Sequence, residues 1–325
     1  MNNFYNDFLK KVKELGISEN DENQIKDNIR WLMENEINIL ITGPTGCGKS
    51  STINALFKTE RAKVGYGSDP ETMDVEKYEL ENMVLWDTPG LGDGKEADLR
   101  HKQNIINKLR EVGKDGRPLV DLVLVILDGS TRDLGTSYEL INDVIIPNLQ
   151  GEKDKRILVA INQADMAMKG RNWNYEKNEP TKKLVDFLDE KVDSIRKRIY
   201  EATGVLVHPI YYSAGYKENE NDVQKPYNLK KLMYYILKTI PTEKRLSYYP
   251  NINKDHTMWV YDDGKKDYGD LIKNIFSKAV IKGILKGVKD GSERGRSGGI
   301  GGIIVGGIFG GIIGGVRSFL SEIFG

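Results

Sequence analysis

The sequence predicts an α/β fold whose mostly parallel sheet is covered by helices on both faces. Short apolar runs alternate with longer amphipathic stretches between residues 36 and 241, as they do when strands alternate with crossover helices. One run, LVDLVLVIL at 119–127, is almost continuously apolar, as expected for a strand that is buried on both faces. A parallel sheet at the centre of the chain accounts for both observations.

The individual elements follow from the same periodicities. Strands are expected at 37–41, 75–80, 82–86, 119–127, 156–161 and 205–212. Helices are expected at 51–58, 97–112, 137–148, 182–200 and 229–240, with a long polar loop at 166–181. Ligands of such sheets bind outside the carboxyl ends of the strands, and every motif described below falls at such an end or in the loop after one.

Composition divides the chain into five segments. Residues 1–35 predict a helical flank packed on the next domain, with a partner-binding arm as the alternative. Residues 36–241 form the α/β domain, and 242–269, which are aromatic and polar without a clear period, predict a linker. A basic amphipathic helix at 270–296 and a Gly-rich hydrophobic tail at 297–325 complete the chain.

Overall composition places few limits on the partners. The formal net charge is zero, with 30% charged residues, so charge gives no support for a nucleic-acid partner. The single cysteine, Cys47, excludes an internal disulfide and suits a reducing compartment such as the cytoplasm. The three histidines lie far apart in the sequence, and the N-terminus lacks the apolar core of a secretory signal.

The segment GPTGCGKSS, residues 43–51, fits the phosphate-loop pattern G-x-x-x-x-G-K-[ST] between an expected strand and an expected helix. Lys49 is expected to reach the β- and γ-phosphates of a nucleotide, and the Ser50 hydroxyl to bind Mg²⁺. The residues expected to surround the phosphates are Gly43, Pro44, Thr45, Gly46, Cys47, Gly48, Lys49, Ser50 and Ser51.

Two further motifs concern the metal and the γ-phosphate. Asp87 opens the sequence DTPG, and its carboxylate is expected to hold Mg²⁺ through water, while the amide of Gly90 meets the γ-phosphate. Thr72 lies in GYGSDPET, between a helix and a strand. Its hydroxyl would complete the Mg²⁺ shell only when the γ-phosphate is present, which predicts a nucleotide-dependent switch.

Two other motifs predict recognition of guanine. The sequence NQAD at 162–165 is similar to the pattern N-K-x-D, in which the final carboxylate accepts hydrogen bonds from the N1 and N2 groups of guanine. Asp165 is that carboxylate, and Asn162 and Gln163 precede it. Ser213 and Ala214 follow the last expected strand and would support the guanine O6 through a backbone amide.

Together these motifs resemble the translation-factor class of P-loop GTPases. More narrowly, GPTGCGKSSTINALF, PET before the second strand and WDTPGLGDG resemble the Era/TrmE/septin-like superfamily. The form G-x-T-G-x-G-K-S-S is closest to the septin, AIG/Toc and immunity-related branches and to uncharacterised bacterial or prophage GTPases. The resemblance covers about residues 36–241. It implies Mg²⁺-dependent hydrolysis of GTP to GDP and phosphate, with Lys49, Thr72 and Gly90 at the reacting phosphate.

Three positions depart from related patterns. Leu91 stands where Ras-like enzymes have a water-orienting glutamine, which implies slow intrinsic hydrolysis and help from elsewhere. Gly46 replaces the asparagine of members that use K⁺, so K⁺ activation is not expected, and Gln163 replaces a base-covering lysine. The resemblance implies pairing of two domains across the nucleotide, and Arg132 in DGSTRDLG is a candidate contact, the alternative being a solvated arginine.

The C-terminal segments predict contact with a membrane. Apolar residues of 270–289 can form one helix face flanked by lysines, as in helices that lie on a membrane or dock on their own domain. Residues 297–316 carry no charge and repeat G-x-x-x-G, and as a helix they would span about 30 Å, the thickness of a bilayer core. A disordered tail is the alternative, and the repeat does not distinguish a helix from a strand.

These features predict a cytoplasmic GTPase that acts as a membrane-associated molecular switch through 270–325 and forms a homodimer across its nucleotide face. One alternative is a GTP-gated membrane scaffold with negligible turnover. The other is a ribosome- or RNA-associated GTPase like Era, which ranks lower because the chain has no recognisable RNA-binding appendage.

Overall fold

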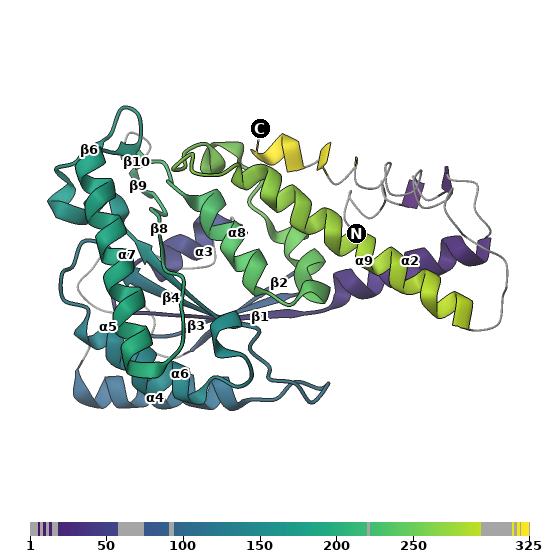
Figure 1. Cartoon of the computed structure of the whole chain (residues 1–325), viewed down its shortest axis with the longest axis horizontal. Helices are drawn as coiled ribbons and strands as arrows, with labels where there is room; N and C mark the ends of the chain where they lie inside the picture. Colours follow the sequence, from purple (N-terminus) through teal and green to yellow (C-terminus); the bar gives the residue numbers. More distant parts are fainter. Residues whose placement is uncertain are drawn as a thin grey trace.

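Figure 1 shows the computed structural model of the chain. It describes residues 19–57, 75–90, 94–219 and 222–293, together with a few positions within 6–14 and 314–324. Thr72 and Leu91, and the apolar tail at 297–313, lie outside the described residues. The predictions for these positions therefore remain predictions.

The central sheet is mostly parallel, as predicted. Its six strands are β1 (Ile37–Thr42), β2 (Glu76–Leu80), β3 (Met83–Asp87), β4 (Leu122–Asp128), β5 (Ile157–Asn162) and β8 (Ile210–Tyr211), in the order β2-β3-β1-β4-β5-β8. All neighbouring pairs are parallel except β2 and β3, which form an antiparallel pair. The carboxyl ends of β1, β3, β4 and β5 therefore meet at one edge.

Helices cover both faces of this sheet. Strand side chains alternate between the two sides: Leu124 and Ile126 belong to one buried cluster, and Val125 and Leu127 to the other. The first face carries α3 (Lys49–Phe57) and α8 (Leu229–Thr239); the second carries α4 (Lys95–Arg110), α7 (Lys182–Thr203) and the helix from α5 (Gly135–Glu139) through η1 (Leu140–Ile145) to α6 (Ile146–Asn148). Figure 1 shows α3 and α8 on one side of the strands and α4 and α6 on the other.

Several boundaries differ from the sequence-based expectation. The strand expected at 205–212 is limited to β8, which pairs with Ala160 and Ile161 of β5. The preceding residue, Pro209, has no N–H to donate to a sheet ladder. The loop expected at 166–181 contains the 3₁₀ helix η3 (Ala164–Gly170) and a small hairpin of β6 (Trp173–Asn174) and β7 (Glu179–Pro180). A second small pair, β9 (Tyr216–Asn219) with β10 (Asp222–Gln224), follows β8.

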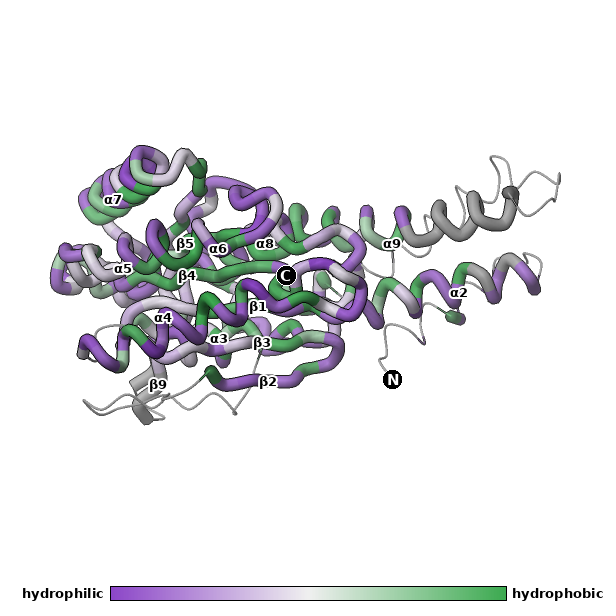
Figure 2. Tube along the Cα trace, turned by 90° about the horizontal axis from the view of Figure 1, so that it is seen from below, coloured by the Kyte–Doolittle hydropathy of each residue, from purple (hydrophilic) through white to green (hydrophobic). Residues whose placement is uncertain are grey.

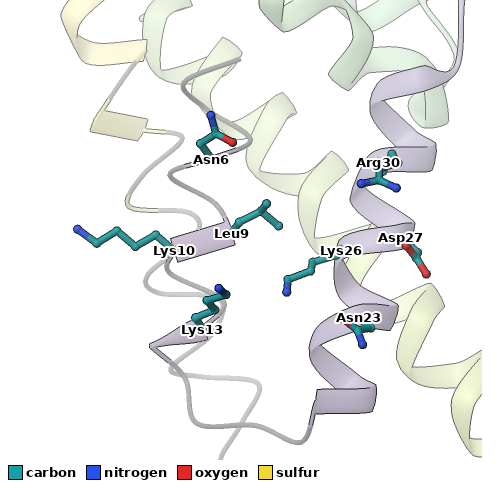
Figure 3. Close-up of a pocket in the computed structure, with 8 residues that line it drawn as sticks. All are labelled: Asn6, Leu9, Lys10, Lys13, Asn23, Lys26, Asp27 and Arg30. Carbon is teal, nitrogen blue, oxygen red and sulfur yellow. The ribbon is translucent and has the colours of Figure 1, made fainter. Parts of the chain in front are cut away.

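The N-terminal flank packs on the domain, as expected. Helix α2 (Glu19–Glu34) buries Ile25, Ile29 and Leu32 in the cluster that covers the first face of the sheet. Leu9 packs against the same cluster and points toward α2, as Figure 3 shows. Beside Leu9, the N-terminal residues and α2 enclose a cleft of about 670 Å³, into which Lys13 and Lys26 point.

The expectation of a linker at 242–269 is wrong. This segment forms two 3₁₀ helices, η4 (Thr242–Asn251) and η5 (His256–Trp259). Large side chains from these helices and the residues between them are buried in the core: Leu246, Tyr248, Tyr249, Ile252 and Trp259. Asn253 joins the segment to α3, donating its backbone N–H to Leu56 O at 2.9 Å and its side-chain amide to Ala55 O at 2.9 Å. The apolar residues of the segment 242–259 follow a 3₁₀ path. They therefore lack the 3.6-residue period that identifies a buried α-helix in a sequence.

The basic amphipathic helix is present and docks on the domain. Helix α9 (Tyr268–Glu293) lies beside α2 and α8, and Ile272, Phe276 and Val280 are buried there. Figures 1 and 2 show α2 and α9 extending together from one end of the sheet. The docked alternative for this helix is therefore the one that the structure shows for residues 268–282.

The last described residues return to the domain. Leu320, Ile323 and Phe324 are buried, and the Phe324 ring meets Trp259 edge-on with ring centroids 5.4 Å apart. Arg317 forms an ion pair with Asp270 at the start of α9, at 3.3 Å. Within the part of the chain that the structure describes, no helix combines the length and apolar character that a membrane crossing requires.

Candidate functional site

The predicted phosphate loop connects β1 to α3 and depends on its glycines. At Gly43, φ is +152°, and an added Cβ would lie 2.0 Å from Ile126 O of β4. At Gly48, φ is +86°, and a Cβ would lie 2.2 Å from Asn162 Nδ2. Side chains would collide at both positions, so the neighbouring strands require glycine in this loop.

Lys49 begins α3 and folds back over the loop. Its buried ammonium donates to Gly43 O at 3.3 Å and to Pro44 O at 3.2 Å. The positive charge therefore lies inside the loop and at the positive end of the helix. Both features favour a bound anion at this position.

Asp87 ends β3 as a fully buried carboxylate. Neither of its oxygens accepts a hydrogen bond of normal geometry from a described residue, although the Ser50 hydroxyl lies close enough to favour the charged form. Burial raises the pKa of Asp87 to about 6, although the Lys49 ammonium opposes the shift. Carboxylate and hydroxyl oxygens are ligands that suit Mg²⁺, so the unpaired Asp87 oxygens and the Ser50 hydroxyl fit the predicted cation.

Gly90 lies against the phosphate loop. A Cβ at Gly90 would come within 2.2 Å of Thr45 Oγ1, so glycine alone permits this approach. His101 of α4 holds the carbonyl of the same residue, because its Nδ1 lies 2.9 Å from Gly90 O and must carry the proton that the carbonyl accepts. Sequence reasoning missed His101, since an isolated histidine in a helix carries no motif.

Asn162 ties three loops together. Its Nδ2 donates to Cys47 O in the phosphate loop at 2.9 Å, and its Oδ1 accepts from the backbone N–H of Ala214 at 2.9 Å. The side chain of Asn162 thus connects the loops that follow β1, β5 and β8. Sequence reasoning placed Asn162 in the predicted base-recognition motif but could not identify these two bonds.

Gln163 and Asp165 occupy the predicted base-recognition loop. Gln163 adopts φ +57° and donates from Nε2 to Gly46 O at 2.8 Å, so it still lies across the phosphate loop in place of a lysine. Asp165 is 6% exposed, and its Oδ1 has no hydrogen-bond partner among the described residues. This oxygen is suited to accept bonds from a ligand. Beside it, Ser213 Oγ accepts from Gly215 N at 3.3 Å.

Cys47 is fully buried inside the phosphate loop. Burial raises the pKa of its thiol to about 11, although the Lys49 charge opposes the shift. Because the thiolate is the reactive form, these surroundings favour a packing role for Cys47 over a redox role.

Arg132 lies in the loop after β4, at the same edge of the sheet, and its side chain is exposed. The predicted residues at strand ends are therefore brought together, apart from Thr72, which is outside the described residues.

Comparison with known proteins identifies relatives of the central domain. Residues 38–163 match the family described as "50S ribosome-binding GTPase". The chain is 34% identical over 120 residues to Translocase of chloroplast 126 of Physcomitrium patens, a match that covers 35% of this chain and 10% of that protein. It is 25% identical over 160 residues to GTPase Der of Staphylococcus epidermidis, covering 48% of this chain and 34% of that protein. The chain thus spans about a tenth to a third of these relatives.

Among solved structures, Toc33 from Arabidopsis thaliana, in a dimerization-deficient mutant, superposes with a TM-score of 0.46 at 16% sequence identity. That match covers 74% of this chain and 97% of the Toc33 chain.

Proposed function

The chain carries a P-loop GTPase domain, and from this premise we propose that it binds GTP with Mg²⁺ and hydrolyses it to GDP and phosphate. One observation supports this most directly. Two buried carboxylates, Asp87 and Asp165, lie at the same edge of the sheet with oxygens that accept no hydrogen bond of normal geometry from a described residue. A guanine nucleotide with its cation would satisfy both.

Each part of the site then has a role. The phosphate-loop amides and Lys49 hold the β- and γ-phosphates, and the amide of Gly90 supports the γ-phosphate while water attacks it in line. Mg²⁺, held by Asp87 and Ser50, would neutralise charge on the phosphate oxygens. Asp165 selects guanine because adenine lacks the paired N1 and N2 donors.

The test is Lys49→Ala. We expect loss of GTP turnover by at least about 100-fold, because the charge that stabilises the transferring phosphate is removed. Multiple-turnover phosphate release measures it, and circular dichroism verifies that the variant is folded. Turnover equal to that of wild type in a folded Lys49→Ala chain would refute the site.

A second copy of the chain is proposed to complete the catalytic centre. The exposed Arg132 lies on the nucleotide side of the sheet and would contact the partner's nucleotide or the dimer face. Specific activity should then rise with protein concentration in wild type and fall in Arg132→Ala. Arg117→Ala is the matched control, since Arg117 is 71% exposed and precedes β4 at the opposite edge. Activity that is independent of concentration, and equal in all three chains, would exclude this role.

Membrane attachment through 270–325 is proposed on the apolar sequence at 297–316. Since α9 contributes Ile272 and Phe276 to the core, truncating the chain before α9 would damage the domain. The sharper variant is the full chain with Val305→Asp and Ile312→Asp. The wild-type chain should float with liposomes, and the double variant should not. Flotation that depends on the bound nucleotide would indicate a switch, and flotation independent of nucleotide would indicate a passive anchor. Equal flotation of both chains, or of neither, contradicts the proposal.

The description of the matched family favours one second candidate, ribosome association. Salt-dependent co-sedimentation with 50S subunits, lost in Lys49→Ala or without GTP, would support it. Sedimentation that is absent at low salt would exclude it.

A further inference from the structure

Lys191, on α7, lies beneath the loop that follows β4. Its ammonium donates to three backbone carbonyls of this loop: Asp128 O at 3.3 Å, Gly129 O at 2.9 Å and Thr131 O at 2.6 Å. A lysine ammonium has three protons. These carbonyls therefore use its full capacity to donate hydrogen bonds.

The charge of Lys191 is held in place rather than solvated. Lys182 and Lys197 of the same helix are 88% and 75% exposed at their side chains, whereas Lys191 is half-buried. Burial lowers the pKa of Lys191, opposed by the charge of Asp128. The Asp128 carboxyl accepts from Ser130 N at 2.7 Å, so it helps shape the loop that Lys191 holds.

The same loop supports the base-recognition residues. Gly129 donates its N–H to Asn162 O at 2.7 Å. A Cβ at Gly129 would lie 2.5 Å from Asn162 O and 2.9 Å from Gln163 O, so the two loops are in close contact. A displacement of Gly129 must therefore disturb Asn162 and Gln163, which both bond the phosphate loop.

Beyond Thr131 the loop is not tightly packed on α7. A surface cleft of about 390 Å³ lies between them, lined by Arg132 of the loop and by Phe187 and Arg198 of α7. Tyr138 of α5 also lines it, and the Arg198 guanidinium lies 5.6 Å from the centre of the Tyr138 ring. If the ammonium were removed, the loop would have space to move, and three carbonyls would lose a donor.

We propose that Lys191 is a positioning residue through which α7 holds two parts of this loop in place. It holds Gly129 against Asn162 and Gln163, and it orients the backbone immediately before Arg132. The part that concerns Arg132 rests on the proposed function.

The test compares Lys191→Met, which keeps the apolar stem, with Lys191→Arg, which keeps charge and donors. Lys197→Met is the matched control on the same helix. We expect Lys191→Met to weaken the affinity of the full chain for a fluorescent GDP analogue by about five-fold. Lys191→Arg should recover part of this loss, and Lys197→Met should bind as wild type does. Thermal unfolding without nucleotide is measured alongside.

A purely structural lysine would lower the melting temperature of Lys191→Met and leave the GDP affinity of the folded chain unchanged. That result overturns the proposal, as does equal weakening in Lys197→Met. Failure of the proposed function is distinguishable, because wild type would then not bind the GDP analogue at all. If wild-type turnover is independent of protein concentration, only the role of Arg132 fails, and the affinity loss in Lys191→Met is still required.

Discussion

Asp87 and Asp165 show at the residue scale that this domain contains buried groups that are costly without a partner. A buried carboxylate without hydrogen bonds destabilises a fold, and both residues have such oxygens. The raised pKa of Asp87 expresses the same cost. Under the proposed function, binding of a cation and a nucleotide would offset this cost by giving both carboxylates partners.

Asp87→Asn should therefore have opposite effects on stability and on function. Without nucleotide and in EDTA at pH 7, we expect the variant to be more stable than wild type by about 1–3 kcal/mol, because a buried charge is removed. With Mg²⁺ and GTP, its turnover should fall by at least about ten-fold. Urea unfolding and phosphate release measure the two effects. An Asp87→Asn chain that is less stable in EDTA and turns over normally would contradict this account.

At the element scale, the loops after β1, β5 and β8 act as one unit because Asn162 joins them. Removing its side chain in Asn162→Ala leaves Cys47 O and Ala214 N without their partners. We expect the unfolding free energy to fall by about 2–4 kcal/mol and nucleotide affinity to fall by about ten-fold or more.

Gln163→Ala is the matched comparison, since Gln163 is half-buried and its side chain donates one hydrogen bond, to Gly46 O. Its effect on stability should stay below about 1 kcal/mol. Denaturant titration measures the stability of both variants, and GDP binding measures their nucleotide affinity. If the two substitutions cost the same stability, Asn162 does not link the loops as described.

The elements also show what sequence could predict. Strands β1, β3, β4 and β5 and the motifs after them have local signals: continuous apolar runs, and glycine or carboxylate positions at fixed spacing. The contacts that brace the site join distant residues, such as His101 with Gly90 or Lys191 with Thr131. No local pattern marks such pairs, so they required the fold. The buried 3₁₀ segment at 242–259 was missed for the same reason, since its burial depends on α3 and α9.

At the scale of the whole molecule, the two ends of the chain build one face of the core. Helix α2, the 3₁₀ helices η4 and η5, helix α9 and the C-terminal residues share a buried cluster with α3 and α8. The predicted nucleotide-binding motifs end near residue 214, yet the hydrophobic core extends from Ile25 to Phe324. The flanking segments are therefore part of the domain's stability and not independent attachments.

Phe324→Ala tests this integration at its most distant point. Phe324 is 8% exposed and meets Trp259 edge-on, and removing a buried phenylalanine costs about 3–5 kcal/mol in a protein interior. Because Phe324 keeps 8% of its surface exposed, we expect a smaller loss of about 2 kcal/mol in the unfolding free energy. Leu99→Ala, at a residue 67% exposed on α4, should cost less than about 0.5 kcal/mol. A Phe324→Ala chain as stable as Leu99→Ala would mean that residues 317–324 are undocked in solution.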